Sequence, residues 1–502
     1  MIDLLISGGT VIDGTGAPRF DADVGVREGR IVFVGAPGDA EAMTTPRTQR
    51  CDATGLIVAP GFIDCHTHDD RALLSSPDMA PKVSQGVTTV VTGNCGISLA
   101  PTGAGLRLPP APPLDLLDPQ GEWFRFASFG AYAEALREAP AAIHAAPLIG
   151  HSTLRLACME RVDREATRAE ILKMRALVEE ALASGAIGCS SGLYYEPAAA
   201  ASTEEVIEVF APMREHGGIY CAHMRDEGEH IIASIEEVVR IGDALGVPAV
   251  ISHHKLAGIP NHGRSRETLA FIDAQRAGRD GRGEDARAST ALCLDCYPYA
   301  ASSTILSEGR AAIASKVLVT WSIPHPEHNG RDLAEIMKAS GLSRADTIAS
   351  LLPAGAIYFS MHENDVQRIL AYEHTMIGSD GLPHDAKAHP RLWGTFPRVL
   401  GHYSRDLKLF ALETAVRKMT GLTASNFGLV DRGEIRVGAF ADLTLFDAAE
   451  VLDMADFDES ARPSKGIAAV FVEGAAVWAK GRPTGNRPGK VLERAPRAAR
   501  AS

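Results

Sequence analysis

The sequence lacks both a basic, apolar leader and any long apolar run. Residues 1–9 include an aspartate at position 3 and a glycine pair, which is typical of a first strand and turn. No apolar stretch approaches the roughly 20 residues that are needed to span a bilayer. We therefore expect a cytoplasmic protein with no membrane partner.

Basic residues are in deficit. The chain has 50 Lys and Arg against 63 Asp and Glu, which gives a formal charge of −13. Sequence-independent binding to nucleic acid requires dense Lys and Arg, so we expect no nucleic-acid partner. A small anionic substrate is not excluded, because a local basic pocket can lie in an acidic protein.

Cysteine is also scarce. Eight cysteines are scattered over 502 residues, a pattern more typical of reduced thiols than of a disulfide framework. Cys293 and Cys296 form a CxxC, but it lies inside an apolar run with no helix start after it. We therefore expect neither a redox pair nor a metal pair there.

The two ends of the chain share one pattern. Residues 1–59 alternate short apolar runs with Gly and Asp turns, and the same pattern returns over 425–482. We predict that these segments build one small β-sandwich beside a central domain at 60–424. Residues 483–502, rich in Arg, Pro and Ala, are predicted to form a tail.

The central part alternates apolar strand-like runs with amphipathic helical stretches. Eight such units are typical of a TIM barrel, so the predicted fold is α/β, a (β/α)8 barrel with a small β-sandwich. The gap between the last two runs predicts an insertion around 300–370, and the Pro- and Gly-rich stretch 101–129 is interpreted as an active-site loop. The eight runs are 57–66, 88–95, 143–151, 186–192, 218–223, 249–254, 292–297 and 375–380.

Metal-binding residue types follow these runs at their carboxyl ends, where TIM barrels place catalytic residues. The first run ends at His66 and His68, and strand alternation puts residues two apart on the same face. Both imidazoles can therefore chelate one cation. The second run ends at Cys95 between glycines, where a thiolate can approach a metal closely, and Zn²⁺ accepts mixed S and N ligands.

Three later runs continue the series. The fifth ends at His223, the sixth at His253 and His254, and the eighth is followed by Asp380. Each residue alone has a structural interpretation, such as a packed histidine or an aspartate that caps a turn. Independent structural roles would not place these residue types at strands one, two, five, six and eight in order. The pattern therefore predicts a metal site.

Six motifs extend this pattern over nearly the whole chain. They are 59–70 (APGFIDCHTHDD), 84–98 (SQGVTTVVTGNCGIS), 217–230 (GGIYCAHMRDEGEH), 251–255 (ISHHK), 295–299 (DCYPY) and 376–395 (MIGSDGLPHDAKAHPRLWGT). By these motifs the chain resembles the D-aminoacylase (N-acyl-D-amino-acid deacylase) group of the amidohydrolase superfamily. The last motif is long and very specific.

The resemblance implies a ligand set. One zinc is held tightly by Cys95, His223 and His253, and a second, weaker metal position lies at His66 and His68. Cys95 then replaces the carboxylated lysine of hydantoinases and dihydroorotases. The fourth run contains no lysine, which independently argues against a hydantoinase-type site. Strand alternation sends only one of the two adjacent histidines inward, and the resemblance favours the first.

The predicted chemistry is amide hydrolysis. Zn²⁺ lowers the pKa of a bound water toward about 7, and three protein ligands leave a position open for it. Asp380 is predicted to take the water's proton and deliver it to the leaving nitrogen. A purely metal-ligating role for Asp380 is the alternative.

A substrate α-carboxylate needs fixed donors. Lys255 lies two residues past His253, on the same strand face, and Arg391 can clamp a carboxylate with two parallel hydrogen bonds. Tyr297 and Ser303 follow the seventh run and can donate hydrogen bonds. The resemblance implies that all four bind the carboxylate.

The same resemblance places Tyr194, Tyr358 and Met361 around a D-side chain, which favours apolar D-residues. Arg310 could instead select an acidic side chain, but we interpret it as a solvated loop arginine. The predicted partner is a small N-acyl-D-amino acid that is hydrolysed to a carboxylate and a free D-amino acid. Preference for the D-form follows from the resemblance alone.

Three other functions stay open. They are deacylation of N-acyl-D-glutamate or N-acyl-D-aspartate, hydrolysis of a cyclic amide, and a non-catalytic role on an amidohydrolase scaffold. The last is disfavoured because every ligand position is filled. The sequence leaves the acyl group and the oligomeric state open.

Overall fold

The computed structural model describes residues 1–103, 105–277 and 291–494. Its centre consists of parallel strands in two sheets, ordered β6-β7-β8 and β17-β13-β12-β11-β10-β9. Each of the eight predicted runs overlaps at least one of these strands. They are β6 (Phe62–Asp64), β7 (Val87–Thr92), β8 (His144–Pro147), β9 (Ile149–Gly150), β10 (Gly188–Gly192), β11 (Ile219–His223), β12 (Ala249–Ile251), β13 (Leu292–Cys296) and β17 (Thr375–Ile377).

The two sheets adjoin at both edges. Strands β8 and β9 are separated by Leu148 alone, and a parallel bridge pairs Thr67, after β6, with Gly381, after β17. The backbone N–H of Asp380 also donates to the carbonyl of His66 at 2.8 Å. The first and last strands therefore present their carboxyl ends side by side.

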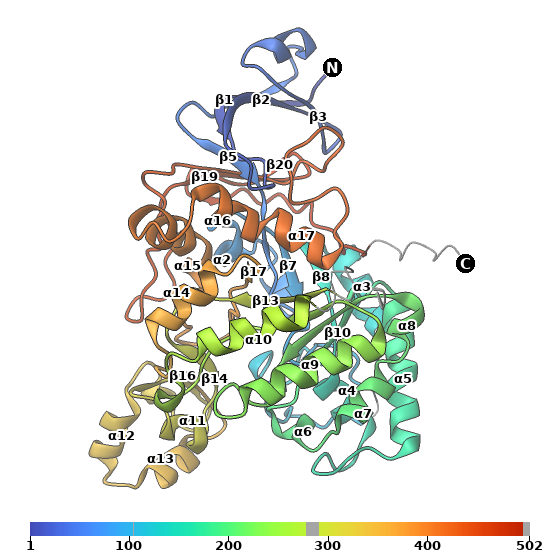
Figure 1. Ribbon diagram of the computed structural model, residues 1–502, viewed down its shortest axis with the longest axis vertical. Helices are drawn as coiled ribbons and strands as arrows, with labels where there is room; N and C mark the ends of the chain where they lie inside the picture. Colours follow the sequence, from blue (N-terminus) through green and yellow to red (C-terminus); the bar gives the residue numbers. More distant parts are fainter. Residues whose placement is uncertain (104, 278–290, 495–502) are drawn as a thin grey trace.

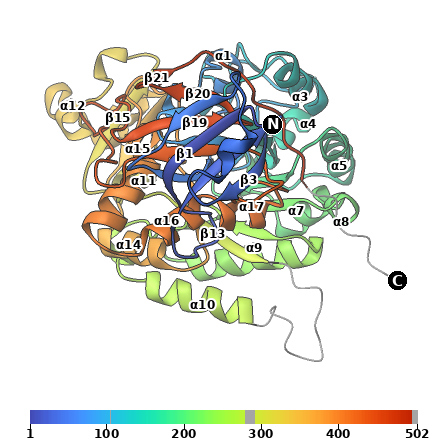
Figure 2. The ribbon, with the colours of Figure 1, turned by 90° about the horizontal axis from the view of Figure 1, so that it is seen from above.

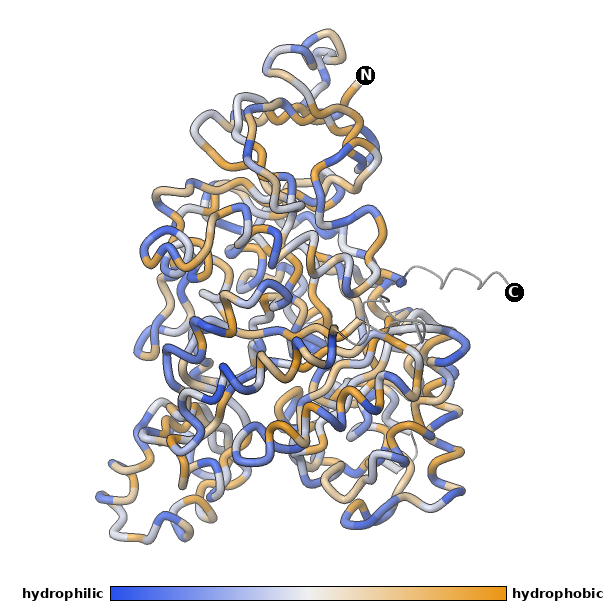
Figure 3. The backbone as a smooth tube through the Cα atoms, viewed as in Figure 1, coloured by the Kyte–Doolittle hydropathy of each residue, from blue (hydrophilic) through white to orange (hydrophobic). Residues whose placement is uncertain are grey.

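Helices cover the outside of these strands (Figures 1 and 2). Helix α5 begins with a capping box in which Thr167 and Glu170 satisfy each other's backbone N–H groups. Along α9 and α10 the hydropathy alternates, as expected for helices that bury one face (Figure 3). The helices of this part are α1 (Ala72–Ser75), α2 (Ala80–Val83), α3 (Phe129–Glu138), α4 (His151–Cys158), α5 (Arg168–Ala183), α6 (Glu196–Ala199), α7 (Thr203–Val209), α8 (Met213–His216), α9 (Ile231–Leu245), α10 (Ser265–Ala277), α14 (Glu363–Ala371), α15 (Arg391–Arg398), α16 (Leu412–Met419) and α17 (Gly421–Phe427).

Both ends of the chain build one nine-stranded sheet, beyond one end of the central strands (Figure 1). Strands β5 and β18 pair antiparallel and join both segments into a single ladder. Buried side chains of both segments, such as Val24 and Leu445, still share one core. The strands are β1 (Leu4–Val11), β2 (Phe20–Arg27), β3 (Arg30–Gly35), β4 (Gln49–Asp52), β5 (Ile57–Pro60), β18 (Leu443–Phe446), β19 (Ile467–Val472), β20 (Ala475–Ala479) and β21 (Arg482–Pro483).

A small antiparallel unit interrupts the chain between β13 and β17, inside the stretch where the sequence predicts an insertion. Its three strands are ordered β14-β16-β15, and its own core includes Val319, Ile336 and Ala356. It projects from the lower edge of the molecule in Figure 1. Its elements are β14 (Ser302–Ile305), α11 (Glu308–Ala312), β15 (Val317–Ser322), α12 (Leu333–Ser340), α13 (Arg344–Leu351) and β16 (Ala354–Tyr358).

The predicted tail is wrong for residues 484–494, which the structure holds against the body. Val491 forms a parallel bridge with Ala145 of β8, and Leu492 is buried. The physical reason is that backbone hydrogen bonds to Ala145 extend the central sheet, which composition does not reveal. The remainder, 495–502, lies outside the described residues.

None of the helices in the described part of the chain combines the length and the apolar content that crossing a membrane would require.

Candidate metal centre

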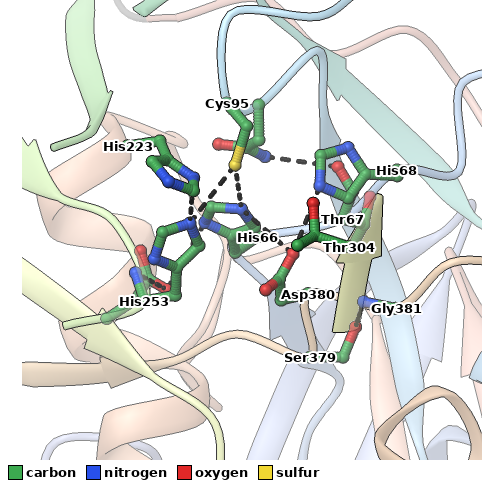
Figure 4. A network of polar contacts seen from close by, with 12 residues as sticks. His66, Thr67, His68, Cys95, His223, His253, Thr304, Ser379, Asp380 and Gly381 are labelled. Atoms are coloured by element: carbon green, nitrogen blue, oxygen red, sulfur yellow. Dashed lines mark hydrogen bonds and ion pairs between the residues drawn. The ribbon is translucent and has the colours of Figure 1, made fainter. Parts of the chain in front are cut away.

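Six side chains that the sequence singled out converge at the carboxyl ends of the strands (Figure 4). Ligand atoms of Cys95, His223 and His253 lie within 4.8 Å of one another, and so do those of His66, His68, Cys95 and Asp380. Cys95 Sγ lies 3.3 Å from His253 Nε2 and 3.2 Å from His66 Nε2. Cys95 therefore belongs to both groups and lies between them.

Backbone conformation aims three of these side chains inward. Cys95, His253 and Asp380 have φ angles of 54°, 37° and 50°, a left-handed region that non-glycine residues seldom adopt. Each lies two or three residues past the end of β7, β12 or β17, in the turn that follows the strand. Such strain persists only where surrounding structure enforces it, and it concentrates at functional sites.

The fit of these residues to zinc can be tested on the donor set. Thiolate and imidazole are the ligand types that zinc prefers, and the separations between Sγ and the imidazole nitrogens are those of atoms that can share one ion. Within the described residues, His223 Nε2 and His68 Nδ1 are buried without a hydrogen-bond partner. The residues present therefore fit a zinc ion.

Electrostatics favour the charged forms of two members. Burial opposes ionisation of the Cys95 thiol, but His66 and His253 hold its pKa well below the usual range. Burial likewise opposes ionisation of Asp380, but Arg391, with Nη1 at 2.9 Å from Oδ2, holds the pKa of that carboxyl well below its usual range. The thiolate can therefore bind metal, and the carboxylate can accept a proton.

His254 lies on the other side of the chain from its neighbour. Its Nε2 lies 2.9 Å from the hydroxyl of Thr268 in α10, and burial lowers its pKa to about 3. This arrangement agrees with the alternation argument, which sends only one of the two adjacent histidines inward.

Two buried carboxylates that sequence reasoning did not assign support the histidines from behind. Asp295, at the end of β13, accepts the backbone N–H of His253 at 2.9 Å and lies 3.5 Å from His66 Nδ1. Glu227, four residues after His223, lies 3.1 Å from His253 Nδ1. Carboxylates in this position fix the tautomer and the orientation of a metal-binding imidazole. Both residues lie inside motifs quoted above, which was the available signal.

Glu227 also lies close to two cationic side chains. It forms an ion pair with Lys255, and its Oε2 lies 3.6 Å from Arg310 Nη2. Burial raises the energy of its charge, but Lys255 and His223 hold its pKa well below the usual range. Glu227 therefore links a metal-binding histidine to two cations that face the pocket.

A buried lysine network holds the loop that carries Asp380. Lys82 Nζ donates to Asp64 at 2.7 Å and to Ser379 Oγ at 2.9 Å. The backbone N–H of Ser379 donates to Asp64 Oδ1 at 2.8 Å. Because Lys82 and Asp64 are fully buried, this network fixes the backbone next to Asp380.

The predicted carboxylate donors lie around the same pocket. Lys255 and Ser303 line it, and the Arg391 guanidinium stacks 4.6 Å from the ring centre of Tyr297. Within the described chain, Tyr297 Oη, Ser303 Oγ and Arg391 Nε are buried without a hydrogen-bond partner. These donors are therefore available to an anion.

Arg310 corrects an expectation. It is only 8% exposed, its guanidinium lies 4.1 Å from the ring centre of Tyr194, and it lines the metal pocket. The interpretation as a solvated loop arginine is wrong, because α11 and the aromatic ring bury it.

Tyr358 and Met361 lie further back than expected. Tyr358 uses its hydroxyl to donate to the Ile305 carbonyl at 2.8 Å inside the inserted unit. Met361 packs on Tyr297 and Tyr299. Both are buried, and neither is among the residues that line the metal pocket.

The CxxC residues do not join the centre. The Cys293 thiol contacts the Ala249 carbonyl, and burial raises its pKa to about 12. Cys296 contacts the Tyr297 carbonyl instead. Both are therefore buried, protonated core thiols.

The parallel-strand scaffold and the mixed cysteine, histidine and aspartate cluster at its carboxyl end define a metal-dependent α/β enzyme. Comparison with known proteins specifies it further. The model of the amidohydrolase family matches residues 49–478, and the chain belongs to this family.

Three similar proteins share nearly the whole chain. D-aminoacylase of Alcaligenes xylosoxydans is 57% identical over 492 residues, which covers 98% of each chain. A solved structure of D-aminoacylase, studied for a binuclear metal centre with one-metal activation and second-metal attenuation, has a TM-score of 0.93 at 57% identity and covers 98% of this chain and 100% of its own. N-acyl-D-glutamate deacylase from Bordetella bronchiseptica, solved with zinc and a phosphonate mimic of the tetrahedral intermediate, has a TM-score of 0.91 at 45% identity, with 98% and 99% covered.

Proposed function

We propose that this chain is a zinc-dependent deacylase that hydrolyses N-acyl-D-amino acids to a carboxylate and a free D-amino acid. The observation that carries the proposal is the convergence of Cys95, His223 and His253 beside Asp380, whose second oxygen contacts Arg391. The similarity to D-aminoacylase over 98% of each chain supports the substrate class.

The tight zinc position is assigned to Cys95, His223 and His253. His66 and His68 form a weaker second position, in keeping with the binuclear centre studied in the similar D-aminoacylase. Zinc at the tight position would supply an activated water and would polarise the amide carbonyl.

Asp380 is the general base and acid of the proposed reaction. Its Oδ1 lies 3.2 Å from His68 Nε2, and Arg391 keeps it ionised at neutral pH. It accepts the proton of the attacking water and returns this proton to the amide nitrogen as the C–N bond breaks. Lys82 and Ser379 keep the carboxylate in place throughout.

The α-carboxylate of the substrate is assigned to Lys255, Arg391, Tyr297 and Ser303. Two of these are cations and two are neutral donors without a partner in the described chain. Charge-assisted hydrogen bonds from a planar guanidinium give both energy and orientation, so the scissile amide is held in one position.

A second candidate concerns the side chain. Tyr194, Tyr358 and Met361 would suit an apolar D-residue, but the buried Arg310 favours an acidic one. An N-acyl-D-glutamate or N-acyl-D-aspartate deacylase is therefore the alternative within the same chemistry.

We also propose that the two parallel sheets close into an eight-stranded barrel. The Thr67–Gly381 bridge and the direct succession of β8 and β9 support closure at both edges. In this division, 60–424 is the catalytic domain, with its insertion around 300–370, and 1–59 with 425–482 is the smaller β domain.

The test is a measurement of zinc content together with hydrolysis of N-acetyl-D- and N-acetyl-L-amino acids. We expect about one tightly held zinc per chain and release of free amino acid from D-substrates only. N-acetyl-D-methionine against N-acetyl-D-glutamate decides the side-chain class. Full zinc content with no D-substrate turned over contradicts the deacylase function while leaving the metal centre in place.

A further inference from the structure

The metal pocket is too small for a whole substrate. Its free volume is about 20 Å³, so the two ends of an N-acyl amino acid must extend into adjoining space. Two larger cavities adjoin the pocket. One, of about 660 Å³, shares Arg310 and Glu227 with it, and the other, of about 420 Å³, shares Leu116. We name them the Arg310 cavity and the Leu116 cavity.

The two cavities have no lining residue in common. The Arg310 cavity also contains Tyr194, so in the proposed function it receives the D-side chain. The α-carboxylate is held by Lys255 and Arg391. The acyl group must therefore lie against the part of the pocket that neither the side chain nor the α-carboxylate occupies.

That wall is the aliphatic part of the pocket. Leu116 and Leu382 are the aliphatic side chains among the pocket-lining residues, and each is only 4% exposed. A hydrocarbon chain leaving the scissile carbonyl along this wall reaches Leu116, behind which the second cavity begins. The direction of the acyl group thus follows from the positions assigned to the D-side chain and to the α-carboxylate.

The Leu116 cavity has a mixed lining. Pro119, Trp321 and Ile323 offer apolar surface. It is also lined by polar groups with buried atoms that lack a hydrogen-bond partner within the described residues: Asp115 Oδ1, Asp385 Oδ2, His384 Nε2 and Arg71 Nε. Asp115 is 4% exposed. Unpaired buried polar atoms favour a ligand that can hydrogen-bond to them.

We propose that the Leu116 cavity is the acyl subsite, and that the enzyme accepts acyl chains longer than acetyl that carry a hydrogen-bonding group at their far end. This inference rests on the proposed deacylase function. A cavity of about 420 Å³ is within the size range of small-molecule sites, so a six-carbon chain is a fitting probe.

The experiment compares N-acetyl-, N-hexanoyl- and N-(6-hydroxyhexanoyl)-D-methionine by kcat/KM. For the wild type we expect kcat/KM to rise by up to about fourfold per added methylene from acetyl to hexanoyl. The hydroxylated chain should exceed the plain hexanoyl chain. A wild type that turns over only the acetyl substrate overturns the inference, and one that turns over none contradicts the deacylase function itself.

Two opposite substitutions sharpen the test. Leu116→Phe adds bulk at the residue that the metal pocket and the Leu116 cavity share, so the ratio of hexanoyl to acetyl kcat/KM should fall at least tenfold. Leu116→Ala removes bulk at the same residue, so the same ratio should rise. Because both readouts are ratios within one variant, partial loss of folded enzyme does not alter them.

Ile313→Phe is the matched control, since Ile313 lines the Arg310 cavity. It should change the ratio of N-acetyl-D-methionine to N-acetyl-D-alanine turnover and leave the acyl-length ratio as in the wild type. If Ile313→Phe controls acyl length and the Leu116 variants do not, the two cavities have the reverse roles and the inference is wrong.

Discussion

Two of the buried clusters of histidine, arginine and carboxylate in the described part of the chain differ in their location and in their hydrogen bonding. The metal centre lies at the carboxyl ends of the parallel strands. The other cluster lies where β8 begins, beside the nine-stranded sheet: Arg432 contacts Asp442 and His144, and its Nη2 lies 3.0 Å from Glu473 Oε1. We refer to this second group as the Arg432 cluster.

The clusters differ in how their polar atoms are satisfied. In the Arg432 cluster, none of the four side chains has a buried polar atom that lacks a partner within the described chain. In the metal centre, atoms of His68 and His223 do lack one. A closed network of charges stabilises the fold, whereas an open one at similar burial is arranged for a ligand.

The largest expected effect is a loss of activity from a change in the metal centre that leaves stability unchanged. Asp380→Asn keeps the shape of the side chain but cannot accept a proton, so kcat should fall about 10³-fold. Zinc content and the free energy of unfolding should stay close to the wild type. The check is single-turnover kinetics with metal analysis on the same sample; retention of more than a tenth of kcat would show that Asp380 is not the base.

The converse variant addresses the Arg432 cluster. Asp442→Asn removes the more buried of the two carboxylates that pair with Arg432, so the free energy of unfolding should fall by about 3 kcal/mol at pH 7. Turnover by the folded fraction should be unchanged. Urea titration of both proteins measures this. A loss of kcat without a loss of stability would show that the Arg432 cluster serves activity and not the fold.

The pairing of Asp442 with Arg432 and His144 makes the free energy of unfolding depend on pH. Burial opposes ionisation of Asp442, but His144 and Arg432 hold its pKa well below the usual range in the folded protein. Its contribution to stability is therefore complete above the unfolded pKa of about 4 and is lost as the pH falls through the folded value. The stability difference between wild type and Asp442→Asn should be constant from pH 7 to 5 and should shrink below pH 4, as urea titrations at each pH would show.

A smaller effect is expected at Glu227, which supports the metal centre from outside. Glu227→Gln retains volume but removes the charge behind His253, so zinc affinity should fall about 10- to 100-fold. Competition with a chelator measures this directly, at a pH where the fold is intact. Glu473→Gln, which removes a carboxylate of the Arg432 cluster, is the matched control and should leave zinc affinity unchanged.

The smallest effect concerns substrate choice. Arg310→Leu should lower the ratio of N-acetyl-D-glutamate to N-acetyl-D-methionine turnover about tenfold, since a charge-assisted hydrogen bond would be lost. Zinc content should not change. An unaltered ratio would mean that Arg310 serves Glu227 and not the substrate.

Much of the centre was predictable because its members follow strands. His66, Cys95, His223 and His253 each lie at or near the carboxyl end of a predicted run, and parallel strands bring such positions together. Glu227 could not be found in this way, since it lies in a loop four residues past its strand and acts through Lys255 and His253.

Arg310 and the chain end show a second limit. Whether an arginine after a polar turn is solvated depends on which ring covers it, and Tyr194 is far away in the sequence. Residues 484–494 have a composition typical of a tail, but their backbone pairs with β8. Similarly, the pairing of β5 with β18 determines that the terminal strands form one sheet, and pattern alone does not give that register.

That pairing has a consequence for synthesis on the ribosome. Strand β5 emerges early, but its partner β18 follows only after the whole central part has been translated. Until then β5 presents an open edge, and open edges favour pairing with other chains. Completion of the nine-stranded sheet is thus a late event of translation, and ribosomes that stall before residue 443 would release chains in which β5 pairs with β1 but lacks its partner on the other edge.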